Sequence, residues 1–161
     1  MRSDAVTLDT SVLEHYFNPD WNGDGHITAL LGRIVSENRT LCFDDGQRIH
    51  DEMFHRLSNY RQHGEFGNFS QLMRGLLAAK EEVTVNHADG LMNCIDGCVR
   101  GSGAEQSDKV LIYVACKTDT LLVSNNASHI TDHAGCLKEC ADHHAGTEPE
   151  FWDSDTATAN L

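Results

Sequence analysis

The sequence predicts an α/β fold, a three-layer α/β/α sandwich built around a central, mostly parallel sheet. Short apolar runs at residues 6–8, 40–43 and 121–123 are typical of buried strands. Between them lie longer segments whose apolar residues recur every three or four positions, as in helices with one buried face. Strands that alternate with helices in this way favour a parallel sheet with helices on both faces.

The expected helices follow in chain order from the spacing of apolar residues. That spacing predicts helices over about residues 12–17, 27–34, 49–57, 72–77, 91–98 and 108–117. Ser107 is the expected N-cap of the last of these, and the Gly101-Ser-Gly103 break ends the helix before it. After about residue 131 the pattern weakens, and only one further helix, through Leu137 and Cys140, is expected.

Length and composition predict one domain. The chain has 161 residues, of which 40% are hydrophobic and 23% are charged, as in a protein that folds around its own core. We expect a single domain over residues 1–150, followed by a polar C-terminal tail at 151–161 that frays at its end. No N-terminal stretch has the features of a signal peptide and no run has the length of a membrane span, so a cytoplasmic protein is expected.

The net charge bears on possible partners. The formal charge of −13 argues against binding of nucleic acid through a broad basic surface, because that mode needs clustered Lys and Arg. It does not exclude a nuclease whose carboxylates surround Mg²⁺, since the bound ion brings positive charge to the place where the phosphate lies.

Four polar or acidic side chains occupy positions where a catalytic cleft is expected. Asp9 follows the first strand, Glu52 lies early in a predicted helix, Asp108 begins another, and Asn126 follows the strand at 121–123. Because parallel strands and the helices after them converge at the carboxyl edge of a sheet, these side chains are expected to share a cleft.

The segments that carry these residues resemble the PIN domain family of metal-dependent ribonucleases, which includes many bacterial toxins. The resemblance spans roughly residues 5–130 and rests on four motifs in the family's order: Leu8-Asp-Thr-Ser-Val-Leu13, Ile49-His-Asp-Glu-Met-Phe54, Ser107-Asp108 leading to Ala115, and Leu121-Leu-Val-Ser-Asn-Asn126. It implies a PIN-like sheet.

The resemblance also implies a function. It assigns Asp9, Glu52 and Asp108 as ligands of Mg²⁺ or Mn²⁺ and, with Asn126, as the catalytic set of an endoribonuclease that hydrolyses RNA phosphodiester bonds. Hard divalent ions prefer the oxygen ligands that these side chains offer. The toxin of a toxin-antitoxin or defence pair, an antitoxin or other protein partner, and a homodimer are further implications of the resemblance alone.

Asn126 departs from the family's pattern, which has aspartate at this place. An amide oxygen can ligate a hard cation but supplies no charge and is a poorer base. Glu105, three residues before Asp108, is a candidate replacement, and His129 and Asp132 are weaker ones. A catalytically decayed, PIN-like interaction module is therefore the main alternative function.

Each acidic residue also has an ordinary structural explanation. Asp9 suits a helix N-cap, Glu52 a solvated helix position, and Asp108 the first turn of a helix, where a carboxylate favours the helix dipole. The set as a whole favours a functional site more than any one member does.

A second cation site is suggested by Asp20-Trp-Asn-Gly-Asp-Gly-His-Ile-Thr28. Asp20, Asn22 and Asp24 stand at the first three ligand positions of a calcium loop, and glycine follows at the sixth position. Position twelve is Leu31, where a bidentate Glu would close the coordination shell. A calcium-binding protein is thus a third, less favoured alternative, and a turn-rich connection is preferred.

The six cysteines are expected to be mostly reduced and buried, because no secretory signal accompanies them. Cys94-x₃-Cys98 and Cys136-x₃-Cys140, near His133, His143 and His144, leave zinc open as an alternative. The spacing is that of successive helical turns rather than of a compact Cys-x₂-Cys knuckle, so buried thiols are preferred.

Overall fold

Five parallel strands form the central sheet of the computed structural model, which describes residues 1–161. In spatial order β3-β2-β1-β4-β5, they are Lys80–Val83, Thr40–Asp44, Arg2–Leu8, Thr120–Val123 and Glu150–Trp152. Every neighbouring pair is parallel. The predicted α/β/α class is confirmed, and the sheet is wholly parallel rather than mostly so.

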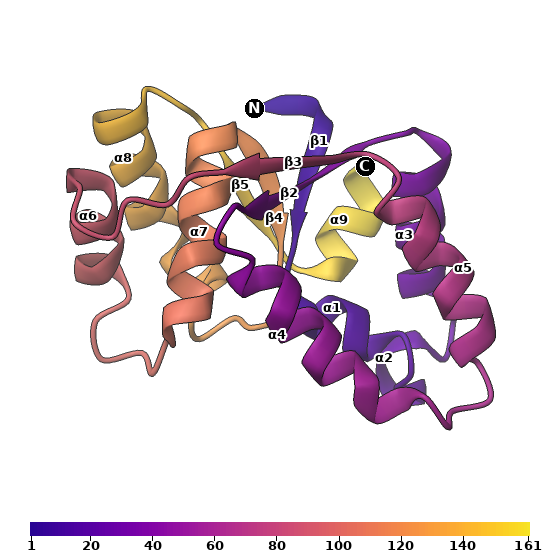
Figure 1. Cartoon of the computed structure of the whole chain (residues 1–161). Helices are drawn as coiled ribbons and strands as arrows, with labels where there is room; N and C mark the ends of the chain where they lie inside the picture. Colours follow the sequence, from indigo (N-terminus) through magenta and orange to yellow (C-terminus); the bar gives the residue numbers. More distant parts are fainter.

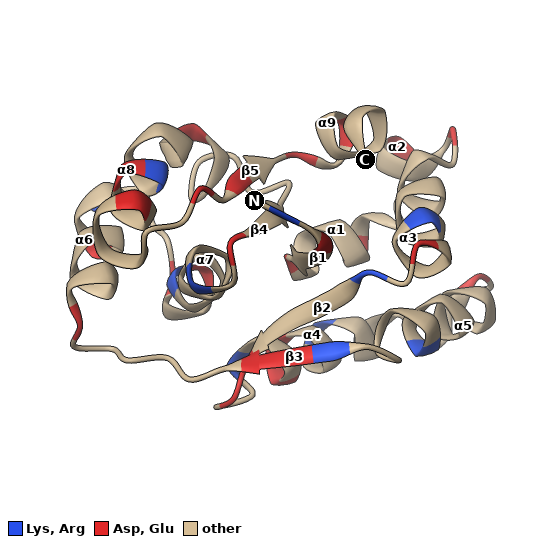
Figure 2. Cartoon of the chain, turned by 90° about the horizontal axis from the view of Figure 1, so that it is seen from above, with Lys and Arg blue, Asp and Glu red and all other residues tan.

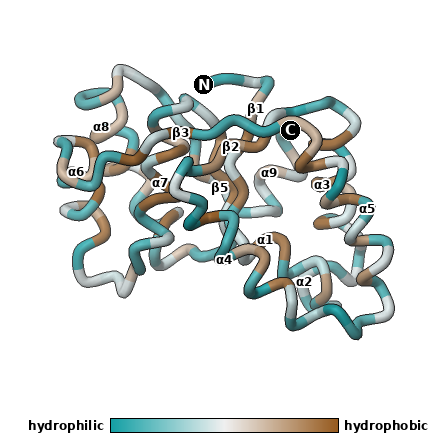
Figure 3. Tube along the Cα trace, viewed as in Figure 1, coloured by the Kyte–Doolittle hydropathy of each residue, from teal (hydrophilic) through white to brown (hydrophobic).

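The burial of each strand follows its place in the sheet. All four residues of β4 are buried, as are the last four of β1, because central strands of a parallel sheet are covered on both faces. The edge strand β3, with the sequence Lys-Glu-Glu-Val, has no buried residue and is largely hydrophilic in Figure 3. Charged side chains on an edge strand discourage pairing with another chain.

Nine α-helices and two short 3-10 turns connect the strands (Figure 1). The α-helices are α1 (Thr10–His15), α2 (Pro19–Asn22), α3 (His26–Ser36), α4 (Arg48–Leu57), α5 (Phe66–Leu76), α6 (Gly90–Cys98), α7 (Gln106–Thr118), α8 (Ala134–Ala145) and α9 (Ser154–Asn160), and the 3-10 turns are Ser58–Tyr60 and Thr131–His133.

The helices form layers on the two sides of the sheet. Figure 2 looks along the molecule from above and shows α6, α7 and α8 on one side and α3, α5 and α9 on the other. Helix α7 contacts β1, β2, β3 and β4 directly, and α6 and α8 pack against α7 and each other. Since α7 is covered from both directions, eight of its 13 residues are buried, which explains its long, nearly continuous apolar run.

The C-terminal residues 151–161 differ from the expected polar tail. Residues 150–152 form β5, which extends the sheet beside β4, and Phe151 is 5% exposed. Asp153 then caps α9 by accepting a hydrogen bond from the Thr156 amide, and α9 packs on α3. The sequence of α9 is polar, and only the small residues Ser154 and Ala157 are buried, so its apolar signal is too weak to predict burial.

The prediction of reduced cysteines is wrong for four of the six. Disulfides join Cys94 to Cys140 and Cys98 to Cys136, tying α6 to α8. The pairs lie 46 and 38 residues apart in the chain, and only the packing of the two helices brings them together.

The other two cysteines are free and buried, as expected. Burial raises the pKa of Cys42 to about 11 and that of Cys116 to about 12, because a thiolate is poorly solvated inside the protein. Both thiols are therefore protonated at neutral pH and unreactive.

None of the helices combines the length and the hydropathy needed to cross a lipid bilayer.

Candidate active site at the carboxyl edge of the sheet

Asp9 stands where the strand order of the sheet reverses. It directly follows β1, which pairs with β2 on one side and β4 on the other. The chain leaves β1 for β2 in one direction and reaches β4 only after crossing back. Ligands of parallel α/β sheets bind outside the carboxyl ends of the strands at such a point. The position of Asp9 is therefore favourable for a binding site whatever the family of the chain.

Asp9 is buried, with 7% exposed, and its carboxylate is held by three donors. Oδ1 accepts a hydrogen bond from the Ser11 amide at 3.2 Å, which makes Asp9 the N-cap of α1. Oδ2 accepts from the hydroxyls of Ser11 at 2.7 Å and Ser124 at 2.5 Å. The expected capping role is thus present, and the Ser124 bond also ties the end of β1 to the loop after β4.

That loop is fixed by the C-terminal segment. The Ser124 amide donates to the carbonyl oxygen of Trp152 at 2.9 Å, and the Asn125 side-chain oxygen accepts from the Ser154 amide at 2.9 Å. The Asn126 amide in turn donates to Ser124 Oγ at 3.0 Å. Residues 124–126 are therefore held from both sides, by Asp9 and by the turn between β5 and α9.

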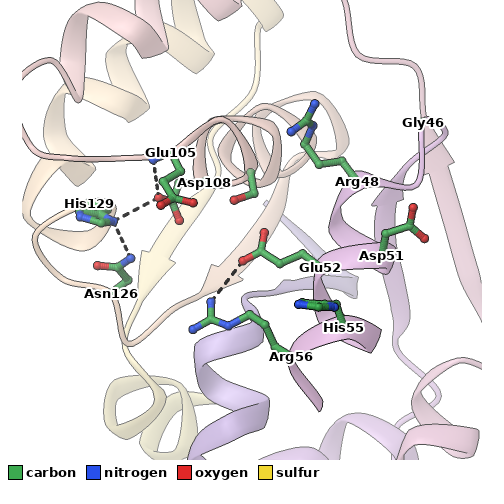
Figure 4. Close-up of a pocket in the computed structure, with 11 residues that line it drawn as sticks. Gly46, Arg48, Asp51, Glu52, His55, Arg56, Glu105, Asp108, Asn126 and His129 are labelled. Carbon is green, nitrogen blue, oxygen red and sulfur yellow. Dashed lines mark hydrogen bonds and ion pairs between the residues drawn. The ribbon is translucent and has the colours of Figure 1, made fainter. Parts of the chain in front are cut away.

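Glu52 lies on the first half of α4 and belongs to a chain of charged pairs. Its Oε1 accepts from Arg56 Nη1 at 3.2 Å, one turn along the helix, and Arg56 Nη2 contacts Glu14 of α1 at 2.8 Å. Figure 4 shows the Glu52 carboxylate reaching toward Asp108 across the cleft. Since Glu52 is partly covered and paired, it is not the fully solvated helix residue that the structural alternative described.

Asp108 forms part of a capping box at the start of α7. Its Oδ2 accepts from the Glu105 amide at 2.8 Å, while the Glu105 side chain accepts from the Asp108 amide. Glu105, and not Ser107, is therefore the N-cap of α7. The rule that favours serine at this place was overridden because glutamate and aspartate three residues apart satisfy each other's amides.

Burial is the main cause that raises the pKa of the Asp108 carboxyl, and the negative charges of Asp9 and Glu52 raise it further. The Glu105 amide and His129 act in the opposite direction. Like charges that disfavour ionisation are a property of carboxylates gathered in one place. A cation bound among them would relieve this repulsion.

Asn126 contacts His129, which in turn contacts Asp108. The Nδ1 atom of His129 lies 2.7 Å from Asn126 Nδ2 and 3.1 Å from Asp108 Oδ2. An unprotonated Nδ1 accepts a hydrogen bond from the Asn126 amide, whereas a protonated Nδ1 donates to the Asp108 carboxylate. His129 thus joins the two ends of the site.

These residues line a cleft with a volume of about 840 Å³ (Figure 4). No hydrophobic residue lines it; its walls are Gly46, Arg48, Asp51, Glu52, His55, Arg56, Glu105, Ser107, Asp108, Asn126 and His129. Asp9 reaches a small adjoining pocket that it shares with Glu52 and Asp108. The three predicted metal ligands therefore meet around one pocket.

The three carboxylates fit a hard divalent cation, with one restriction. Asp108 Oδ1 and Glu52 Oε2 accept no hydrogen bond within the chain, so each has lone pairs available. The ligand oxygens of the three residues are not all within 4.8 Å of one another, a condition that only a cysteine group meets. A Mg²⁺ site built here would hold one or two carboxylates and complete its shell with water, as Mg²⁺ sites commonly do.

Two predicted reserves, Glu105 and His129, lie in the cleft, whereas Asp132 is an exposed residue of a 3-10 turn outside it. The sequence did not single out Arg48, His55 or Arg56, which line the cleft from α4, the two arginines with a positive charge. The sequence signal that could have identified them is their spacing, because each lies one helical turn before or after Glu52.

The calcium-like segment adopts a different structure. Asp20 and Asn22 belong to the short helix α2. The Asn22 side-chain oxygen accepts from the Thr28 amide at 3.2 Å, and Asp24 contacts His26 Nδ1 at 2.8 Å. Two of the three expected oxygen donors are thus engaged within the chain, as in the turn-rich connection that the sequence favoured.

Comparison of the chain with models of known protein families, with curated proteins and with solved structures finds no match.

Proposed function

We propose that the chain is a PIN-like, Mg²⁺- or Mn²⁺-dependent endoribonuclease, with Asp9, Glu52 and Asp108 as its metal ligands. The observation that carries this proposal is the meeting of the three carboxylates around one pocket at the point where the strand order reverses. They come from the residue after β1, from α4 and from α7, so no local sequence rule places them together. A site assembled from distant segments is typical of catalytic clefts in α/β sheets.

The chemistry of the pocket suits phosphodiester hydrolysis. A divalent cation bound here would activate water as the nucleophile and offset the charge that develops on the phosphate. Asp9 is positioned for its part by the hydroxyls of Ser11 and Ser124, and Asp108 by the Glu105 amide. Ligands locked in this way lose little freedom when the ion binds.

The walls of the cleft favour an anionic substrate. Arg48 and Arg56 project into an otherwise acidic region, with His55 and His129 nearby (Figure 4). A guanidinium matches the geometry of a phosphate and stays charged at all physiological pH values. The overall excess of acidic residues, visible in Figure 2, disfavours broad contact with nucleic acid, so a short stretch of RNA in the cleft is the expected substrate.

The test is cleavage of a panel of single-stranded and structured RNAs by the purified chain. We expect cleavage with Mn²⁺ or Mg²⁺, loss of cleavage with EDTA and its recovery when Mn²⁺ is added in excess. Asp9→Asn should reduce the rate by roughly 100-fold or more, since removing a carboxylate from such a site removes several kcal/mol of transition-state stabilisation. The matched control is Asp142→Asn, because Asp142 is an exposed residue of α8 outside the cleft.

Two further measurements control for a contaminating nuclease and for loss of folding. Because the proposed nucleophile is water, a substrate with a single 2′-deoxy residue at the cleavage site should still be cut, whereas a contaminating nuclease that uses the 2′-hydroxyl would stop there. Circular dichroism should show that Asp9→Asn is folded. A folded wild-type chain that cuts no RNA at any metal concentration would sink the proposal.

A catalytically decayed interaction module is the second candidate, and Asn126 is the observation that favours it. The residue lies in the cleft and faces His129, so a carboxylate there would be well placed, but the amide brings no charge. This candidate predicts a cleft that binds a protein or RNA partner without cleaving it. An antitoxin partner and a homodimer belong to the ribonuclease proposal and depend on it. The two disulfides count against the expected cytoplasmic location, because disulfides are rare in a reducing compartment.

A further inference from the structure

Helices α6 and α8 bring four cysteines into one cluster, defined by Cys94 and Cys98 on α6 and Cys136 and Cys140 on α8. Each pair is spaced by one helical turn. The first cysteine is bonded to the last and the second to the third. Cys98 Sγ lies 3.5 Å from Cys140 Sγ, a member of the other disulfide, so the two bonds lie side by side.

Three of the four sulfur atoms lie close enough together to bind one metal ion after reduction. The Sγ atoms of Cys94, Cys98 and Cys140 all lie within 4.8 Å of one another. In a tetrahedral zinc site with Zn–S bonds of about 2.3 Å, neighbouring sulfurs are about 3.8 Å apart. Cys136 lies outside this group of three in the oxidised chain, and because it is bonded to Cys98 and lies one turn before Cys140, it is the proposed fourth ligand.

We propose that the cluster is a redox-switched zinc site, with two disulfides in the oxidised state and a tetrahedral Zn²⁺ bound by four thiolates in the reduced state. Each disulfide takes up two electrons and two protons from its reductant and becomes two thiols. Zn²⁺ then replaces the four thiol protons, which are released to solvent. A phosphine reductant balances the first step, because it is oxidised to its oxide with an oxygen atom from water.

The surroundings of the sulfurs predict an order for the reduction. Cys136 is exposed, whereas Cys140 is only 1% exposed. A reductant therefore reaches the Cys98–Cys136 bond first, and the Cys94–Cys140 bond opens second. The single open pair supplies two thiolates, so tight zinc binding requires both bonds to open.

Replacement of the two disulfides by a zinc ion has a structural consequence. Helices α6 and α8 both pack on α7, whose first turn carries Asp108. Coordination by four thiolates holds the same two helices together that the disulfides hold in the oxidised chain. The switch thus allows this side of the molecule to stay assembled in both reducing and oxidising surroundings, and it does not depend on the proposed ribonuclease activity.

The experiment uses the full chain, reduced with a phosphine under anaerobic conditions and titrated with Co²⁺ and then Zn²⁺. We expect one metal ion per chain, with the thiolate charge-transfer and intense visible bands of tetrahedral Co²⁺ that Zn²⁺ abolishes. The oxidised chain should bind neither ion in this way. Cys42→Ser with Cys116→Ser is the matched control and should behave like wild type, because these thiols lie outside the cluster.

Two variants make the assignment specific. Cys98→Ser with Cys136→Ser should lose the tetrahedral spectrum, and Cys136→His should keep a tetrahedral spectrum with weaker charge-transfer bands, since imidazole replaces one thiolate. The proposal is overturned if the reduced chain binds no metal, if the double variant retains the wild-type spectrum, or if reduction unfolds the chain and Zn²⁺ does not restore its circular dichroism.

Discussion

The acidic cleft and the four-cysteine cluster lie on either side of α7 and are held together by opposite means. In the cleft, like charges gather near the carboxyl edge of the sheet, and non-covalent contacts restrain them, such as the hydrogen bonds from Ser11 and Ser124 to Asp9 and the ion pair of Arg56 with Glu52. In the cluster, two covalent bonds join helices that already pack together. The gathering of like charges in the cleft lowers the stability of the fold, whereas the disulfides of the cluster raise it. Changes in the cleft should therefore affect chemistry, and changes in the cluster should affect folding.

Removal of both disulfides is expected to have the largest effect on stability. Replacing all four cysteines of the cluster by alanine removes two cross-links. The shorter of the two loops that they close spans 38 residues. The loop-closure model gives a loss of about 4 kcal/mol or more in the free energy of unfolding. Urea unfolding of the oxidised wild type and the variant measures it. A loss below about 1 kcal/mol would show that the helices need no covalent tie.

Asn126→Asp is expected to strengthen the cleft as a metal site. A second anionic group beside Asp108 should lower the half-saturating Mn²⁺ concentration roughly tenfold, which corresponds to about 1.4 kcal/mol. Calorimetric titration with Mn²⁺ measures this directly and does not require activity. A matched Asn160→Asp substitution on α9 adds the same charge away from the cleft and should leave the affinity unchanged. Equal affinities in all three chains would argue that Asn126 is not at the metal site.

Asp108→Asn is expected to change the pH dependence of stability in the metal-free chain. Burial raises the pKa of Asp108, so its contribution is favourable at low pH, where the carboxyl is protonated, and is lost as pH rises through the raised pKa. The free energy of unfolding of the variant minus that of the wild type should therefore be larger at pH 7 than at pH 4. Thermal unfolding in EDTA at the two pH values gives the difference. An unchanged difference would mean that the cleft imposes no electrostatic cost.

Asp20→Ala is expected to have the smallest effect. Asp20 is exposed and its side chain makes no hydrogen bond, so the free energy of unfolding should change by no more than about 0.5 kcal/mol. Addition of Ca²⁺ should leave the unfolding temperature of both chains the same. A shift with Ca²⁺ that disappears in Asp20→Ala would restore the calcium-binding alternative.

The layers and the central strands could be predicted because their information is local. The apolar runs that became β1, β2 and β4 and the helical spacing of α3 and α4 follow directly from burial on one or both faces. The positions of Asp9 and Asp108 at helix starts and of Glu52 in the first half of α4 could be predicted for the same reason.

Features that depend on distant partners could not be predicted. The Ser124 hydroxyl binds a carboxylate 115 residues away, and the disulfide partners are chosen by how α6 and α8 pack. Helix α9 was missed because small polar residues bury little apolar surface, so neither period nor hydropathy marks it. In the sequence His129 resembles an ordinary surface histidine, because its contact with Asp108 depends on the fold of the loop after β4.

The hydrogen bonds between residues 124–126 and the turn between β5 and α9 also affect when the site can form during synthesis. The first strand is synthesised long before Trp152 and Ser154, the residues that fix the loop beside it. The surroundings of Asp9 are therefore completed only after β5 and the start of α9 have been made and have packed against that loop.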